Sequence, residues 1–214
     1  MITTYIISNK ITYIRNNIIL TSIYFLFIGY FNAFITLNII DPLRYSNPLP
    51  DIGHTYLPFI SNKVPNYMIC IYVIYFILRQ IFNKYRKEDI LRFLWCINIL
   101  FTLRIFTYTL TIEPPPLSLC ADRDPNSKYI WNVLLYLYNN SDNTCLDMMF
   151  SGHACYFTIV YMSIINRSEY MGEKIINSFI FVIGMLSIIA AHIHYTSDVI
   201  VGLILSMLIY DKTI

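Results

Sequence analysis

The chain has 214 residues, of which 57% are hydrophobic, 16% aromatic and only 13% charged. Soluble domains carry about 25% charged residues, so this composition favours a membrane protein over a soluble domain. The net charge is +2 and no basic patch is interleaved with aromatic side chains, which excludes nucleic acid as a partner. A chain of this length is expected to form one domain.

Six segments are expected to cross the membrane as helices, each of which needs about 20 mostly apolar residues. In chain order they cover 17–40, 65–83, 90–112, 147–166, 174–191 and 195–211. The last two share one apolar stretch, which as a single helix would be about 58 Å long, twice the hydrocarbon thickness. The chain must therefore turn, and the polar cluster from His192 to Asp198 is the place for it. We expect an all-α membrane protein, with residues 1–214 forming one bundle of six transmembrane helices.

Six spans place both termini on the same side, and the positive charges predict which side this is. One side collects Lys10, Arg15, Arg79, Lys84, Arg86, Lys87, Arg92, Arg167, Lys174 and Lys212. The other side collects Arg44, Lys63, Arg123 and Lys128. Because cytoplasmic loops are enriched in Lys and Arg, both termini are expected to be cytoplasmic. The loops 41–64 and 113–146 and the turn 191–197 then face a lumen or the exterior.

The cysteines divide between this outward side and the spans. Cys120 and Cys145 fall in the loop 113–146, in a compartment that permits disulfides. They either form a bridge or remain two free thiols, and the sequence leaves both alternatives open. Cys70, Cys96 and Cys155 fall in spans and are expected to be packing residues.

Ionisable residues inside spans are rare and mark function by default. The first is Arg104, which lies about eight residues inside the third span, roughly 12 Å deep. This is too deep for a snorkelling side chain, so a buried anionic partner is expected, either a carboxylate or a bound phosphate. Guanidinium suits phosphate because its planar fork donates two parallel hydrogen bonds.

The second site is His153, in the stretch CLDMMFSGHACYF of residues 145–157. A lone histidine on an apolar face is usually structural. This one, however, has Asp147, Ser151 and Gly152 close by, and lies at the same depth and side as Arg104. Glycine lets the backbone approach a ligand closely and serine supplies a donor.

The third site is AHIHYTSDV, residues 191–199, where His194 and Asp198 are four apart and lie on one face if the turn is helical. A carboxylate on one imidazole nitrogen leaves the other free to act as base or nucleophile. One alternative is a polar helix start capped by Ser197 or Asp198. Another is a zinc site of His153, His192, His194 and Asp198. No HExxH spacing occurs, however, and histidines two apart diverge on a helix.

These sites converge at one membrane boundary, which favours a functional interpretation of all three. Together they supply a cation, two histidines and a carboxylate. This set fits phosphoryl transfer: the cation offsets phosphate charge, one histidine attacks phosphorus, and the other protonates the leaving oxygen.

Four stretches resemble, in order, the motifs of the sphingomyelin synthase family, a branch of the PAP2 lipid phosphatase superfamily. They are PLPDIGH (48–54), LRIFTYTLTIEPPP (103–116), CLDMMFSGHACYF (145–157) and AHIHYTSDV (191–199). The resemblance covers about residues 40–205. It implies a six-helix bundle in the Golgi, the endoplasmic reticulum or the plasma membrane, with the site facing the lumen or the exterior.

The resemblance also implies a reaction. Family members move a phospho-headgroup, with phosphocholine the first candidate, from a glycerophospholipid such as phosphatidylcholine to ceramide, releasing diacylglycerol. By the family pattern His194 is the nucleophile and Asp198 makes it basic, while His153 protonates the departing oxygen and then deprotonates the ceramide hydroxyl. The intermediate is a phosphohistidine, and no metal or nucleotide cofactor is implied. The residues expected to contact the substrate are Arg104, Asp147, Ser151 and Gly152.

The chain departs from the family pattern in two places: Leu146 replaces a glycine and Ala154 replaces a threonine. Ethanolamine and inositol donors therefore remain open, as does the oligomeric state. The alternative is a lipid phosphate phosphatase of the same superfamily. Those enzymes carry K-x6-R-P and S-R-x5-H, whereas here Ile188 follows Ser187 and no K-x6-R-P occurs. A non-catalytic lipid-binding or translocating protein is the third reading, disfavoured by the intact His–His–Asp set.

Overall fold

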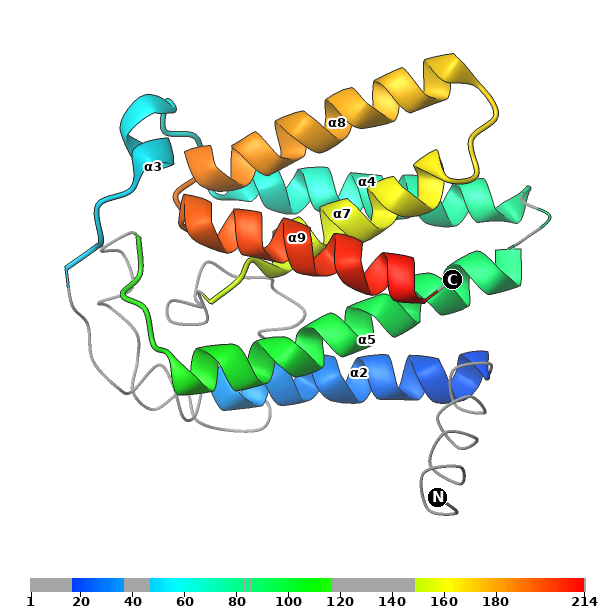
Figure 1. Cartoon of the computed structure of the whole chain (residues 1–214), viewed down its shortest axis with the longest axis horizontal. Coiled ribbons are helices and arrows are strands. Elements are labelled where there is room, and N and C mark those ends of the chain that lie inside the picture. The colour runs from blue at the N-terminus through cyan, green and yellow to red at the C-terminus, as the bar shows by residue number, and fades with distance from the viewer. Residues whose placement is uncertain (1–16, 37–46, 83, 85, 117–148, 214) are drawn as a thin grey trace.

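The computed structural model describes residues 17–36, 47–82, 84, 86–116 and 149–213. Within these ranges the chain is helical and contains no strand, which confirms the expected all-α class (Figure 1). The helices are α2 (Ile18–Ile35), α3 (Ile52–Tyr56), α4 (Lys63–Ile81), α5 (Arg86–Leu110), α7 (Gly152–Ile165), α8 (Met171–Ala190) and α9 (Thr196–Lys212).

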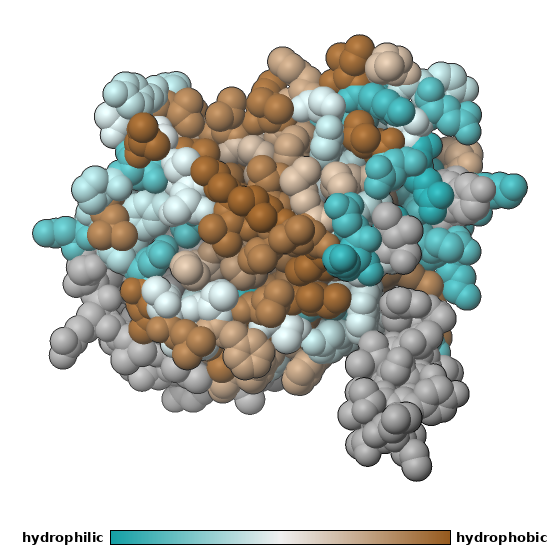
Figure 2. All heavy atoms as spheres, viewed as in Figure 1, coloured by the Kyte–Doolittle hydropathy of each residue, from teal (hydrophilic) through white to brown (hydrophobic). Residues whose placement is uncertain are grey.

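An apolar belt surrounds the bundle. Figure 2 shows it on one face as a brown band that separates two teal, hydrophilic ends. Large apolar side chains on the outer helices are exposed, among them Phe27, Ile74, Phe106, Phe179 and Ile204. A soluble monomer rarely exposes a continuous apolar surface of this extent. Together with the apolar composition, this identifies an integral membrane protein.

Among the residues that the structure describes, four helices are long and apolar enough to cross a membrane: α2, α4, α5 and α8. The other two expected spans correspond to α7, with 14 residues, and α9, with 17. The complete six-span arrangement and the side on which the termini lie therefore stay predictions.

Helix α7 lies in the middle of the bundle, where it packs against α4, α5, α8 and α9. Its side chains Phe157, Ile159 and Ile164 are fully buried. In lipid, close packing rather than the hydrophobic effect holds helices together. Gly202 on α9 illustrates this, because a Cβ there would lie 2.9 Å from the carbonyl oxygen of Ser151. The approach of α9 to the start of α7 therefore requires glycine.

Helix α2 lies against α5 at the edge of the bundle. Polar side chains join the two helices: the Tyr24 and Thr102 hydroxyls are 2.6 Å apart, and the Asn98 amide donates to the carbonyl of Thr21 at 3.1 Å. Such bonds between helices are one of the main sources of cohesion where water is absent.

The ends of α5 and α8 and the beginnings of α4, α7 and α9 gather at one end of the bundle, beside α3, on the left in Figure 1. Local sequence sets these helix ends. Ser151 has extended backbone and accepts a hydrogen bond from the Ala154 N–H, so α7 begins at Gly152 rather than near residue 147. Three prolines, residues 114–116, follow the end of α5 and cannot continue it.

Candidate active site

The two histidines of the third and fourth motifs lie together at this end. His153 is in the first turn of α7, and His194 is in the turn between α8 and α9. Their ring centroids are 6.0 Å apart, with the ring planes inclined by 64°. His194 is buried and His153 is half-buried. The Nε2 of His153 lies 2.6 Å from the Oδ1 of Asn66 on α4, a residue that carried no signal in the sequence.

Asp198 lies close both to His194 and to the start of α9. Its Oδ2 lies 3.8 Å from the Nδ1 of His194, as expected for residues four apart. The same oxygen accepts a hydrogen bond at 3.1 Å from the backbone N–H of Tyr195, the residue that precedes the first turn of α9. The carboxylate at the start of α9 is therefore held against the imidazole.

Arg104 is 7% exposed, so its side chain does not reach the membrane surface by snorkelling. Its Nε donates to the carbonyl oxygen of Phe150 at 3.1 Å. This acceptor is a backbone carbonyl, so the bond orients the guanidinium. Gly152 packs directly on the group, since a Cβ there would lie 3.6 Å from the Arg104 Cζ. The structure thus brings together Arg104, Gly152 and the first turn of α7.

Ser151, which the sequence analysis expects to contact substrate, makes two structural hydrogen bonds. Its Oγ accepts from the Ala154 N–H at 3.2 Å, and its own N–H donates to the carbonyl of Asp198 at 3.0 Å. Ser151 therefore caps α7 and ties it to α9. It is completely buried, which leaves its substrate contact a prediction.

Three residues of the sequence analysis lie outside the described ranges: Asp147, Cys120 and Cys145. Their expected roles stay predictions. Of the cysteines in the spans, Cys96 and Cys155 are buried, whereas Cys70 is exposed. All three are free thiols.

The first motif, PLPDIGH, acquires a role that its sequence did not reveal. The Asp51 carboxylate accepts from the Thr196 N–H at 2.9 Å and from the Thr196 hydroxyl at 2.7 Å. The His54 Nε2 lies 3.0 Å from the carbonyl oxygen of His194. Helix α3 therefore braces the turn that carries His194. The sequence identified the motif but could not place it, because its contacts join residues more than a hundred positions apart.

His192 faces this brace rather than the other two site histidines. Its ring stacks on His54, with centroids 4.1 Å apart, and meets the edge of Phe59. Burial lowers the pKa of His192, and the neighbouring His54 lowers it further. Across the described ranges, no group of three or more His, Cys, Asp or Glu residues is placed to hold a metal ion. The arrangement gives the zinc alternative no support.

A carboxyl that the motifs did not single out for catalysis also approaches Asp198. Burial raises the pKa of Glu113 to about 7, and the nearby Asp198 carboxylate raises it as well. The segment around Glu113 is fixed by Tyr195, whose hydroxyl donates to the carbonyl of Pro114 at 2.8 Å. Glu113 and Tyr195 therefore link the end of α5 to the start of α9.

Two residues next to the site have left-handed backbone conformations. Phe150 has a φ of 38° and His192 a φ of 52°. Such conformations are uncommon for residues other than glycine and cluster at functional sites. Each stands just before one of the paired histidines in the chain.

Known proteins are similar in sequence to the part of the chain that contains this site. Residues 144–213 match the family model described as PAP2 superfamily C-terminal, and this range contains His153, His194 and Asp198. The human phosphatidylcholine:ceramide cholinephosphotransferase 1 is 26% identical over 183 residues, which cover 76% of this chain and 43% of that protein. The human phosphatidylcholine:ceramide cholinephosphotransferase 2 is 28% identical over 178 residues, covering 76% and 48%.

The rat form of the second enzyme is 27% identical over 180 residues. The chain thus spans about half the length of the curated relatives it matches. The four motifs, the family model and these relatives agree, and the chain is similar to the sphingomyelin synthases of the PAP2 superfamily, as its motifs predict.

Proposed function

We propose that the protein is a phosphosphingolipid synthase. It transfers a phospho-headgroup, with phosphocholine the first candidate, from a glycerophospholipid to ceramide and releases diacylglycerol. The observation that carries this proposal is the pairing of His153 and His194, 6.0 Å apart, at one end of an apolar bundle. The similarity to two cholinephosphotransferases supports the choice of substrates.

In the first step, the Nε2 lone pair of His194 attacks phosphorus while the bond from phosphorus to the diacylglycerol oxygen breaks. His153, entering as imidazolium, donates its proton to that oxygen. Asp198 lies on the Nδ1 side of His194, where a carboxylate stabilises the positive charge that develops on the ring. The products are diacylglycerol and a headgroup-phosphohistidine.

In the second step, the primary hydroxyl of ceramide attacks the same phosphorus. His153, now neutral, removes the hydroxyl proton while the phosphorus–nitrogen bond breaks, which restores both histidines. The cycle consumes no water and needs no oxidant or reductant.

Charge on the transferred phosphate is offset by Arg104 and by the start of α7. Guanidinium binds phosphate oxygens with directed hydrogen bonds, and the N-terminus of a helix carries partial positive charge. Gly152, the first residue of α7, lies beside the guanidinium, where a Cβ would be 3.6 Å from the Arg104 Cζ. The start of α7 and Arg104 are therefore placed to contact the same phosphate. Asp147 is proposed to contact the headgroup.

The site is placed by this proposal at the outer or lumenal boundary of a single six-span domain, with α7 and α9 as the two shorter spans. The bias of Lys and Arg toward the opposite side supports that orientation. The corresponding membranes are those of the Golgi, the endoplasmic reticulum or the cell surface.

The test uses purified protein in vesicles with fluorescent ceramide and one phospholipid donor at a time: choline, ethanolamine or inositol. We expect a new phosphosphingolipid and an equal amount of diacylglycerol, both lost in His194→Ala. The control is Ser197→Ala, an exposed position in the same segment. Phosphate or phosphocholine released without any dependence on ceramide would instead identify a hydrolase of the PAP2 type.

A further inference from the structure

The partner of His153 differs in kind from the partner of His194. The Oδ1 of Asn66, in the first turn of α4, lies 2.6 Å from the Nε2 of His153. We propose that Asn66 is a positioning residue that holds the proton of His153 on Nε2, so that Nδ1 is the nitrogen that exchanges a proton with the lipid oxygens. This inference rests on the proposed function for the identity of those oxygens.

The direction of the hydrogen bond follows from the chemistry of its atoms. An amide oxygen has lone pairs and no hydrogen, so it can only accept. The Nε2 of His153 must therefore carry the hydrogen that bridges the 2.6 Å separation. In the neutral ring the remaining nitrogen, Nδ1, then has the lone pair that a general base requires.

The choice of an amide suits a residue that both gives and takes a proton. The groups around His153 are Asn66 from α4, Arg104 from α5, His194 from the turn before α9 and Asp198 from α9, whose carboxylate lies against His194. A carboxylate bonded directly to His153 would stabilise its imidazolium and weaken it as an acid. An amide fixes the ring orientation without adding charge.

The two histidines are thereby given different tasks by their partners. The Asp198 carboxylate lies 3.8 Å from the Nδ1 of His194, which favours a nucleophile that must tolerate positive charge. His153 has a neutral acceptor on Nε2, which favours alternation between acid and base. If the two partners were exchanged, the two histidines would be less well suited to these separate tasks.

The first test does not depend on turnover. The chain contains four histidines, so ¹⁵N-histidine NMR of the protein in nanodiscs gives few signals, which single substitutions assign. We expect His153 as the Nε2–H tautomer in the wild type and in Asn66→Asp, and a mixture of tautomers in Asn66→Leu. A wild-type His153 with its proton on Nδ1 would overturn the proposal, whatever lipid the enzyme uses.

The second test is kinetic. Loss of the hydrogen-bond partner of a metal-bound histidine typically costs about 10–100-fold in activity. We expect a loss of similar size in kcat for Asn66→Leu, with little change in KM. Asn66→Asp should recover part of the rate and move the limb of the pH–rate profile that His153 governs to higher pH by about one unit. The control is Tyr67→Leu, exposed in the same turn of α4, which should behave as wild type.

Unchanged kcat in Asn66→Leu, or faster turnover because Nε2 is released, contradicts the inference. A wild-type protein that transfers no headgroup from any donor, yet shows the Nε2–H tautomer, would remove the proposed function and leave the positioning role of Asn66 in place.

Discussion

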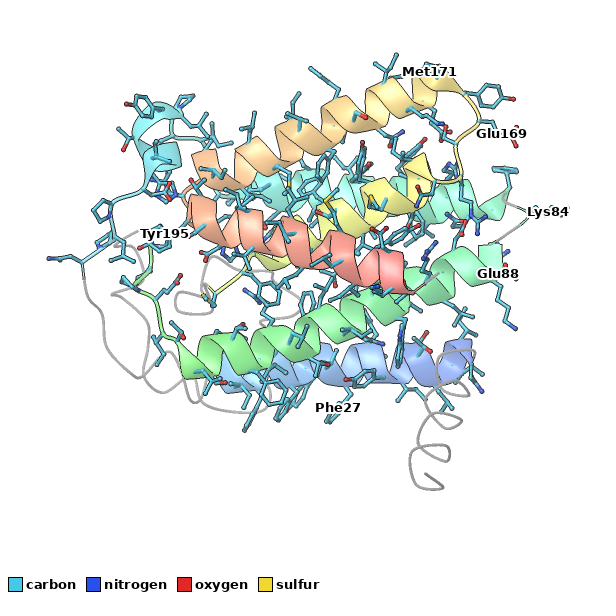
Figure 3. The ribbon with its side chains drawn as sticks, in the orientation of Figure 1. Phe27, Lys84, Glu88, Glu169, Met171 and Tyr195 are labelled. Carbon is cyan, nitrogen blue, oxygen red and sulfur yellow. The ribbon has the colours of Figure 1, made fainter. Side chains whose placement is uncertain are left out.

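The two ends of the bundle are held together by different kinds of interaction. At the end opposite the site, charged side chains pair directly across helices: Arg79 with Glu173 at 2.8 Å, and Arg167 with Asp89 at 3.0 Å. Figure 3 labels Lys84, Glu88 and Glu169 at that end and Tyr195 at the site end. At the site end, carboxylates bind backbone N–H groups and lie against imidazoles instead.

This difference indicates how the bundle divides its tasks. Paired opposite charges satisfy each other, which serves cohesion where lipid gives the helices little hydrophobic reason to associate. The His153 imidazole makes a hydrogen bond through Nε2, and His194 lies 3.8 Å from the Asp198 carboxylate through Nδ1, so each ring has a second nitrogen for chemistry. We therefore expect substitutions at the site end to affect turnover and substitutions at the far end to affect stability.

The largest effect is expected for His194→Ala. Loss of a covalent nucleophile lowers turnover by about 10³-fold or more. The melting temperature should stay close to wild type, because the backbone carbonyl that accepts from His54 remains. Both quantities are measured on the same purified preparation. Turnover within a few-fold of wild type would assign the nucleophile elsewhere.

A smaller loss is expected for Asp51→Asn, which keeps the shape of the brace but removes its charge. Hydrogen bonds to a charged acceptor are about twice as strong as neutral ones, and we expect kcat to fall about 10-fold as the His194 turn loosens. Thr196→Val, which removes one of the two bonds to Asp51, should show a milder loss in the same assay. A lower melting temperature with unchanged kcat would make the brace purely structural.

At the far end, Glu173→Gln should reverse this pattern. Glu173 accepts from Arg79, Tyr75 and Ser168, so its charge organises a network between helices. We expect the free energy of unfolding of Glu173→Gln to fall by about 1–2 kcal/mol and its melting temperature to fall by about 2–8 °C. The kcat measured at low temperature should be unchanged. Reduced kcat in a fully folded sample would show that the two ends are coupled.

The smallest effect concerns Glu113. Burial, and then Asp198, raise its pKa to about 7 from the ordinary 4.5. The folded state therefore holds a proton that the unfolded state releases, and the free energy of unfolding falls as pH rises from about 4.5 to 7. Glu113→Gln should flatten that slope in melting curves recorded from pH 5 to 8. An equally steep decline in the variant would assign the slope to other groups.

Much of this architecture follows from sequence pattern, and the exceptions have physical reasons. The expected spans 65–83, 90–112, 174–191 and 195–211 agree with the bounds of α4, α5, α8 and α9 to within four residues, whereas the end of the span expected at 17–40 lies outside the described residues. The start of α7 was placed too early, because the cap of Ser151 outweighs the apolar run before it. The i, i+4 spacing of His194 and Asp198 was a local signal and predicted their contact.

The partners of those residues were not predictable in the same way. Asn66 is a neutral residue on an apolar helix, 87 positions before His153, so no spacing rule joins them. The contact of His54 with His194 spans 140 positions. Contacts of this kind depend on which helices become neighbours, which the composition of each helix leaves undetermined.

The two left-handed residues, Phe150 and His192, have a consequence for how the protein tolerates change. Glycine would adopt their φ angles of 38° and 52° without the penalty that a side chain incurs there, about 1–2 kcal/mol per residue. Glycine would also make the backbone just before His153 and His194 more flexible. Selection for stability alone would favour glycine at both positions, whereas this chain has the aromatic side chains of Phe150 and His192 there. For Phe150→Gly or His192→Gly we therefore expect a higher melting temperature together with a lower kcat.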